Sequence, residues 1–391
     1  MKNKTKLFAP TILCLRLFLL LVALFWFAPL TNAQDSKPSQ KLIIKPIPDG
    51  YTIIDGDIVM PSEFVEAILR KKDQSPLAPE ATYRTNLWTN GIIPFEFQIT
   101  NALPSNCPNA TPSGSVSSAN QSVMISAMAV LETVANGNFQ QCAGASCPNG
   151  SRVLVRDTTN DIIRNAANNC VSGAANSSRV GMVGGQQIIN IVSWNSQFII
   201  IHELLHALGF YHEHIRPDRN TFVQINCGNV QGGCGTTFFN TNFSVPGDAS
   251  AYGYYDFDSL MHYSQCEFSI DCPPGSNCAC TNTVMTVLAP NQSQQTLIGQ
   301  RTHLSVLDQA TLSFLYPFDN WRFLDCTYNG SNGASDGSFL RPYTTLAAAL
   351  ANTPAGGTIW VLRNCYFQAA GTYGNRVTIR AAPGVTATFG G

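Results

Sequence analysis

The chain has 391 residues, 45% of them hydrophobic and only 12% charged, and its formal net charge is −1. This length allows two domains together with processing segments. Because the charges nearly cancel, the composition favours neither nucleic-acid binding nor binding to an anionic membrane surface.

The first 33 residues have the pattern of a secretory signal peptide. Three lysines precede an apolar run at 17–30, and Thr31 and Ala33 supply the small residues that a cleavage site requires. The run is short for a membrane span, so we expect cleavage and no stable membrane association afterwards; an uncleaved anchor is the alternative. The sequence therefore predicts a secreted or extracellular protein, with a periplasmic or cell-surface location also open.

The cysteine content fits this prediction. Removal of a signal that contains Cys14 leaves twelve of the thirteen cysteines. An even number in an exported chain predicts disulfide bonds rather than reduced thiols. Four cysteines crowd one short stretch and predict a stapled loop whose pairing is left open: Cys266, Cys272, Cys278 and Cys280.

Residues 34–83 are polar and end in a linker rich in proline and charge, which we expect to be a propeptide. Apolar periodicity then predicts a folded domain at 84–318. Strands are expected at 92–99, 151–157 and 179–192. Helices are expected at 119–136, 196–208 and 304–317, the first with an apolar face formed by Val123, Ala127, Val130 or Leu131, and Val134. Ser305 and Asp308 predict a capping box at the start of the third.

Four of the six histidines lie in the stretch HELLHALGFYHEH, residues 202–214. His202 and His206 are four residues apart, so they share one helix face, opposite the apolar stripe of that helix. Gly209 ends the helix and lets His212 return to the same point. Three imidazoles with an open fourth position are typical of one catalytic zinc ion.

Glu203, next to the first histidine, is expected to take a proton from a water molecule and later pass it to the leaving amine. His214 is expected to lie at the surface or behind the ligands, because zinc already has its three protein ligands.

The stretch HELLHALGFYHEHIRPDR resembles the signature of the astacin family of zinc endopeptidases, within the metzincins. LWTNGIIPFEF, FDSLMHYS and IGQRTHLSVLDQATLSFLYP resemble other parts of that domain, over about 84–317. The resemblance implies an α+β, two-lobed, zincin-like fold with a twisted mixed sheet, an active-site helix and a less regular lower lobe. It also implies Met261 as a hydrophobic floor and Tyr263 as a zinc-binding, oxyanion-stabilising residue. His262 is not expected to be a ligand.

The resemblance has further implications outside the metal site. Glu213 would meet the processed N-terminus, the alternative being an exposed carboxylate. Asp57, within IIDGDIVMP, would cap zinc in a zymogen, the alternative being a simple turn at 55–57. Cys142 fits a family disulfide position, for which Cys326 is an approximate partner.

Residues 319–391 are expected to form a small β-rich module with a short helix at about 344–352. They resemble the opening of a right-handed parallel β-helix, with only one or two rungs. Such a fragment needs additional support. It could pack against the protease, be stapled by a hypothetical Cys326–Cys365 bond, or continue into further chain. Its partner, if it has one, is unknown.

Together these features predict a secreted zinc endopeptidase, made as a zymogen, that hydrolyses proteins or peptides. The alternatives are a cell-wall amidase and a surface-binding protein that uses a protease-like scaffold.

Overall fold

In this computed structural model the described residues are 46–47, 51–54, 58–61, 83–102, 107–108, 110–143, 146–147, 150–164, 168–272, 278–368, 376–383 and 385–390. The chain divides into two units, 1–41 and 42–391, and every described residue belongs to the second. The predicted signal at 1–33 and Asp57 fall outside the described residues. Within the part that is described, no helix has both the length and the apolar character that a membrane span requires.

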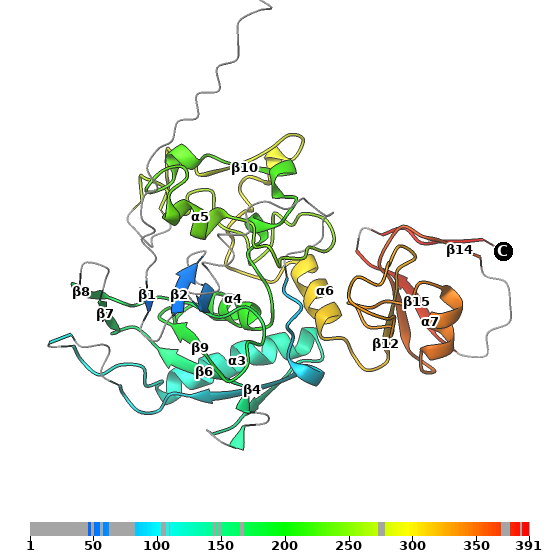
Figure 1. Ribbon diagram of the computed structural model, residues 1–391, viewed down its shortest axis with the longest axis horizontal. Helices are drawn as coiled ribbons and strands as arrows, with labels where there is room; N and C mark the ends of the chain where they lie inside the picture. The colour runs from blue at the N-terminus through cyan, green and yellow to red at the C-terminus, as the bar shows by residue number, and fades with distance from the viewer. Residues whose placement is uncertain are drawn as a thin grey trace, which may run out of the picture. The chain divides into compact units, whose positions relative to one another are not determined.

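A four-stranded parallel sheet supports the first half of the protein (Figure 1). Its strands, in spatial order, are β5 (Asn138–Gln141), β4 (Ile92–Phe97), β6 (Arg152–Asp157) and β9 (Gln186–Ile191). All three pairings are parallel. Two isolated antiparallel bridges add to these strands and give the sheet the mixed character expected of it: Ser177 pairs with Asn190 of β9, and Gly114 pairs with Asp157 of β6.

The apolar alternation predicted at 92–99 holds for most of its length. Ile93, Phe95 and Phe97 are buried in the main core, as a half-buried strand requires. Ile99, however, is 74% exposed, because β4 ends at Phe97 and the chain leaves the sheet before reaching it.

Two helices pack together against this sheet: α3 (Ser118–Val134) contacts β5, and α4 (Gln197–Ala207) contacts β9. The apolar face expected for α3 was right at Ala127 and Leu131, whereas the predicted valines are only partly buried. The residues buried on α3 are Met124, Ala127, Met128 and Leu131. Both sets of positions recur with helical spacing, so periodicity alone could not separate them, and the partly buried valines lie beside the face that meets the core.

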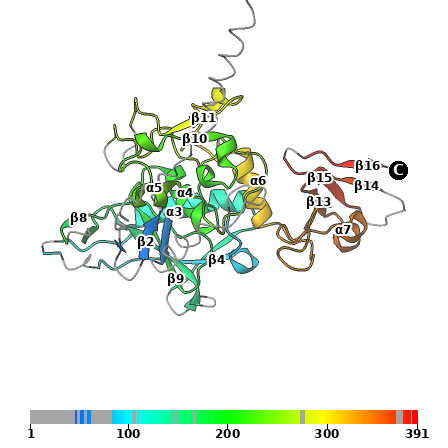
Figure 2. The ribbon, with the colours of Figure 1, turned by 45° about the horizontal axis from the view of Figure 1, so that its top comes forward.

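A second, less regular lobe has a hydrophobic cluster of its own. Its regular elements are β10 (Val223–Ile225), α5 (Thr237–Phe243) and β11 (Met285–Val287), and β10 pairs antiparallel with β11. Figures 1 and 2 both show α4 between this lobe and the sheet. The α+β class and the two-lobed arrangement are thus confirmed.

The remaining elements are short. A three-stranded antiparallel sheet is formed by β1 (Pro46–Ile47), β2 (Tyr51–Ile54) and β3 (Ile58–Pro61). A two-stranded antiparallel sheet is formed by β7 (Ile162–Arg164) and β8 (Cys170–Ser172). Short 3₁₀ helices are η1 (Thr89–Gly91), η4 (Glu213–Ile215), η5 (Arg219–Thr221), η6 (Cys227–Asn229) and η7 (Gln292–Gln294).

Helix α6 (Val306–Leu315) follows the second lobe and begins with the predicted capping box. The Ser305 hydroxyl accepts the Asp308 N–H at 2.9 Å, and the Asp308 carboxylate accepts the Ser305 N–H at 3.1 Å. The helix ends two residues before Pro317, which cannot continue it.

The described residues after α6 form two parallel sheets and one helix. The elements are β12 (Trp321–Leu324), α7 (Leu346–Asn352), β13 (Thr358–Val361), β14 (Tyr366–Gln368), β15 (Thr378–Ala381) and β16 (Thr388–Gly390). The sheets are β12-β13-β15 and β14-β16. Sequence patterns did not indicate β12 or β14, and the β-helix resemblance stays a prediction.

This module contacts α6 through aromatic side chains. The module has a hydrophobic core of its own, which includes Leu324, Ile359 and Val361 from its larger sheet. Phe339 and Trp360 instead reach the Phe314 ring of α6, with centroids 5.6 and 5.2 Å away. The module therefore shares the main hydrophobic core of the protein.

Six disulfides join all twelve cysteines after Cys14: Cys107–Cys170, Cys142–Cys147, Cys227–Cys234, Cys266–Cys280, Cys272–Cys278 and Cys326–Cys365. The stapled loop is confirmed, with its two bonds nested, and so is the hypothetical bond within the module. The pairing of Cys142 with Cys326 was wrong, because each cysteine has a partner within its own part of the fold.

We expect the Cys107–Cys170 bond to contribute more to stability than Cys142–Cys147. The first closes a sequence separation of 63 residues and the second only 5. Since loop-closure entropy grows with the logarithm of length, replacing both cysteines by serine should lower the free energy of unfolding by about 4 and about 2 kcal/mol, respectively. Urea denaturation of the two double variants checks this, and equal losses would contradict it.

Candidate metal centre

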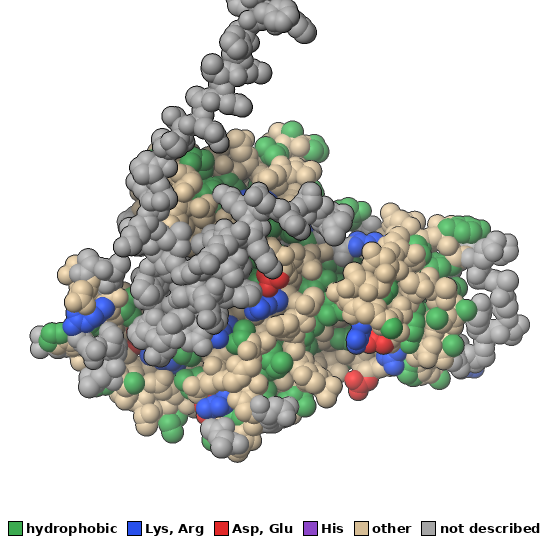
Figure 3. Space-filling view, in the orientation of Figure 1, with side chains coloured by type: hydrophobic (Ala, Val, Ile, Leu, Met, Phe, Trp, Pro, Cys, Tyr) green, Lys and Arg blue, Asp and Glu red, His purple; other side chains and the backbone are tan. Residues whose placement is uncertain are grey.

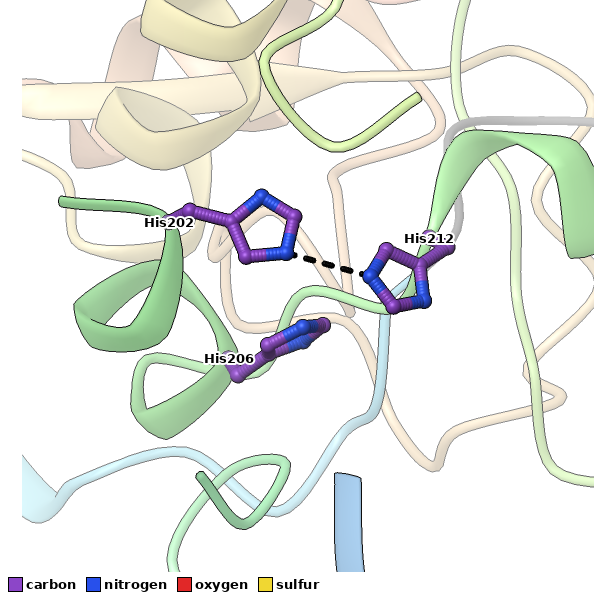
Figure 4. Close-up of side chains that lie close together, drawn as sticks. All are labelled: His202, His206 and His212. Atoms are coloured by element: carbon purple, nitrogen blue, oxygen red, sulfur yellow. Dashed lines mark hydrogen bonds between the residues drawn. The ribbon is translucent and has the colours of Figure 1, made fainter. Parts of the chain in front are cut away.

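Three histidines converge on one point inside the protein (Figure 4). His202 and His206 come from α4, and His212 comes from the chain that returns after the helix. One ring nitrogen from each lies within 4.8 Å of the other two, and all three side chains are buried. The Nε2 atoms of His202 and His212 are 3.1 Å apart, a separation that suits two ligands of one tetrahedral ion.

The return of the chain depends on Gly209. Its φ is 111°, in the region that favours glycine, and a Cβ there would lie 3.3 Å from the Arg84 carbonyl oxygen. The Phe210 N–H then donates to the Leu205 carbonyl at 3.0 Å, which closes the turn. The predicted role of Gly209 is therefore confirmed.

The two helical histidines are oriented by backbone carbonyls. His202 Nδ1 lies 3.0 Å from the Leu260 oxygen, and His206 Nδ1 lies 2.7 Å from the Phe210 oxygen. Because a carbonyl can only accept, each Nδ1 carries the proton, and each Nε2 presents its lone pair to the cluster. The donor set therefore fits a zinc ion, which prefers neutral imidazole nitrogen.

The predicted apolar stripe of α4 packs in the main core, and its two histidines converge with His212, but both faces of the helix are enclosed. Every residue of this helix from Ile200 to Ala207 is buried, including His202, Glu203 and His206. The helix lies between the sheet and the second lobe, so its polar face is enclosed as well. Glu203 is 1% exposed and precedes His206 by three residues, which places it on the adjacent helix face.

The loop beneath the cluster is held by Asp308 at the start of α6. Its carboxylate accepts the Leu260 N–H at 2.8 Å and the Ser259 hydroxyl at 2.7 Å. Burial raises the pKa of Asp308, and these donors act in the opposite sense. Since the Leu260 carbonyl orients His202, Asp308 supports the position of His202 through the backbone of Leu260. Sequence analysis identified Asp308 only as a helix cap.

Met261 and Tyr263, the residues suggested by resemblance, lie close to the cluster. Met261 is buried in the main core, and its carbonyl accepts the Glu213 N–H at 3.0 Å. The Tyr263 ring lies 4.5 Å from the His212 ring. His262 lies outside the cluster: its Nδ1 donates to the Tyr263 carbonyl at 2.7 Å and its Nε2 accepts from the Tyr255 hydroxyl at 2.8 Å. Burial lowers the pKa of His262 to about 3.

Glu213 and His214, immediately after the third histidine, are both buried. This overturns the exposed alternative for Glu213 and the surface alternative for His214. Glu213 Oε1 accepts from Arg216 at 3.1 Å and from the Asp256 N–H at 2.8 Å. Burial is the largest influence on Glu213 and raises its pKa to about 8, although Arg216 lowers it.

Arg216 was not identified from the sequence. Its side chain is fully buried and donates to Glu213, Asp218 and the carbonyl of Gly253. It thereby ties the segment after the third histidine to the loop at 252–254. The only signal in the sequence is the run of charge, RPDR, directly after the histidine motif.

Two histidines of an H-E-x-x-H helix and a third from the chain after it form a buried cluster between a sheet and a second lobe, the pattern of metzincin-type zinc peptidases. The peptidase family described as Astacin matches residues 113–317, just over half of the 391 residues, and the chain belongs to this family. The match begins after β4, although β4 is an inner strand of the sheet.

Individual proteins show the same similarity. The chain is 32% identical over 171 residues to an astacin-like metalloendopeptidase of Mus musculus, which covers 42% of this chain and 34% of that protein. It is 37% identical over 145 residues to tolloid-like protein 1 of Homo sapiens, covering 36% and 13% of the two chains. The matched part of the chain therefore spans about a third or less of these relatives.

Among solved structures, high choriolytic enzyme 1, a hatching enzyme zinc-protease from Oryzias latipes, is similar with a TM-score of 0.42 and 26% sequence identity. That similarity covers 59% of this chain and 92% of the other.

Replacing His212 by alanine should abolish tight zinc binding. Removing a residue that hydrogen-bonds to a metal ligand costs about 10- to 100-fold in metal affinity. Removing a ligand itself should therefore cost more than about 100-fold. Zinc content after dialysis against a competing chelator measures the effect. His303→Ala is the control, since the His303 side chain is 50% exposed and pairs with Asp258. Retention of one zinc ion by His212→Ala would show that His212 is not a ligand.

Proposed function

We propose that the protein is a secreted zinc endopeptidase that hydrolyses proteins or peptides and is made as an inactive precursor. The observation that carries the proposal is the orientation of the histidines. Two backbone carbonyls fix the protons of His202 and His206 on Nδ1, so that both Nε2 atoms and His212 can share one ion. Zinc bound there would polarise the scissile carbonyl and acidify a water molecule.

The chain's own residues would carry the proton transfers. Glu203 would accept a proton from the attacking water and later deliver it to the leaving nitrogen, because it is the buried carboxylate next to two ligands. The hydroxyl of Tyr263 would stabilise the oxyanion that develops on the substrate carbonyl. Its ring position beside His212 supports that role.

The proposed order of the chain is a signal peptide at 1–33, a propeptide and linker at 34–83, a protease domain at 84–318 and a small module at 319–391. Six disulfides support passage through an oxidising compartment. In the propeptide, β2 and β3 pair antiparallel with Ile54 opposite Ile58, on either side of Asp57. We propose that Asp57 caps zinc until the propeptide is removed.

The proposal is tested by hydrolysis of a denatured protein by the propeptide-free enzyme. Activity should disappear with a zinc chelator and return when zinc is restored. Release of fragments from cell wall but not from protein would favour the amidase. A folded, zinc-loaded enzyme that cleaves neither would contradict the proposal.

A further inference from the structure

The Tyr263 ring has one stacked neighbour among the residues that the structure describes. The His214 ring lies 3.9 Å from it with an interplanar angle of 21°. The other rings around Tyr263 meet it at steeper angles: His212 at 50°, Phe268 at 68° and Phe243 at 84°. One face of the tyrosine ring is therefore covered by His214, and the remaining neighbours limit the sideways movement of the ring.

His214 is itself held in place. It is fully buried in the 3₁₀ helix η4, two residues after His212. Its Nε2 lies 3.1 Å from the Asn242 carbonyl of α5, and its own carbonyl accepts from Arg219 at 3.1 Å. Phe243 packs edge-on against the imidazole, with centroids 5.6 Å apart. These contacts hold the His214 imidazole in place, and the Tyr263 ring stacks on it.

We propose that His214 is a positioning residue that acts through Tyr263, by holding the tyrosine ring beside the metal centre. The inference rests on the role proposed for the Tyr263 hydroxyl. A stacked ring pair shifts a conformational equilibrium by about 2- to 10-fold beyond what area burial supplies. Without the stack, the Tyr263 ring would spend less time beside His212, and its hydroxyl would less often be poised to act.

Two substitutions separate the stack from the hydrogen bond. His214→Phe keeps an aromatic ring but loses the donor to the Asn242 carbonyl. His214→Gln keeps a donor but has no ring. We expect kcat of His214→Gln to fall by about 2- to 10-fold with little change in KM, and His214→Phe to stay close to wild type. If His214→Gln does not fold, His214→Leu provides a ringless side chain of similar bulk.

The second measurement is the absorption spectrum of a metal ion bound by the protein. In cobalt-substituted protein, the visible absorption spectrum of His214→Gln should move towards that of Tyr263→Phe, while His214→Phe keeps the wild-type spectrum. In a Tyr263→Phe background, His214→Gln should lower kcat no further, because the hydroxyl through which it acts is gone. Urea denaturation and zinc content show that each variant is folded and loaded.

The outcomes separate this inference from the proposed function. Identical spectra and kcat for wild type and Tyr263→Phe would overturn the role of Tyr263, and this inference with it. If those two differ, wild-type values for His214→Gln overturn only the inference. Equal losses in His214→Phe and His214→Gln, or an unchanged effect of His214→Gln in the Tyr263→Phe background, also overturn it and assign His214 a purely structural role.

Discussion

Replacing Glu203 by glutamine is expected to lower kcat for peptide hydrolysis by about 10²- to 10⁴-fold while zinc remains bound. The amide has nearly the same shape as the carboxylate but cannot accept a proton at neutral pH. Glu203 is 1% exposed on α4 and is not among the three converging histidines, so the substitution should leave the histidine cluster assembled. Steady-state kinetics on a denatured protein and metal analysis of the same sample measure both effects.

Two variants provide the comparison for Glu203→Gln. Glu132→Gln changes an exposed carboxylate on α3 and should leave kcat unchanged. His212→Ala should lose both activity and zinc. A Glu203→Gln enzyme with more than a tenth of the wild-type kcat would show that another group moves the proton.

Replacing Phe339 by alanine is expected to lower the free energy of unfolding by about 3–5 kcal/mol. Phe339 belongs to the C-terminal module but is only 6% exposed. Its ring lies 5.8 Å from Tyr83, 5.1 Å from Tyr252 and 5.6 Å from Phe314, all of which lie in the chain before the module. Truncation would leave a cavity between the module and the chain before it, because the surrounding aromatic rings are held in place by their other neighbours.

Urea denaturation of the full chain measures the loss. Tyr366→Ala is the matched control, since Tyr366 is an aromatic residue of the same module that is 64% exposed, and its change should remain within about 0.5 kcal/mol. Similar stabilities for Phe339→Ala and Tyr366→Ala would show that the module contributes little to the core of the protease.

Figure 3 shows how charged side chains are distributed on one face of the protein. Lys, Arg, Asp and Glu side chains are few and scattered on the face shown, as the 12% charged content suggests. The stability of the protein therefore depends on its shared core and its six disulfides more than on surface ion pairs, which individually contribute about 0–1 kcal/mol.

Local chemistry made the elements of the metal centre predictable. The four-residue spacing of His202 and His206, and the glycine that turns the chain towards His212, specify a geometry within a short stretch. The capping box of α6 was predictable for the same reason. Tyr263 required resemblance to a family, since no spacing rule connects it to the histidines.

Features that depend on contacts between distant segments were not predictable. Which face of α3 is buried depends on the contacts that the helix makes with the sheet and with α4. The burial of His214 and Glu213 follows from the second lobe and the loop at 252–256, which close over them. Disulfide partners likewise depend on which strand ends meet, so Cys142 was assigned the wrong partner while the cysteines crowded at 266–280 were recognised as a stapled loop.

The link from Asp308 through Leu260 to His202 has a consequence for how the protein is made. Synthesis proceeds from the N-terminus, so the histidine motif leaves the ribosome long before the helix that steadies it. Until Asp308 emerges, the loop that orients His202 lacks its anchor, and the His202 ring is not held beside the other two imidazoles. We therefore expect tight metal binding only after the second lobe and the start of α6 have been made.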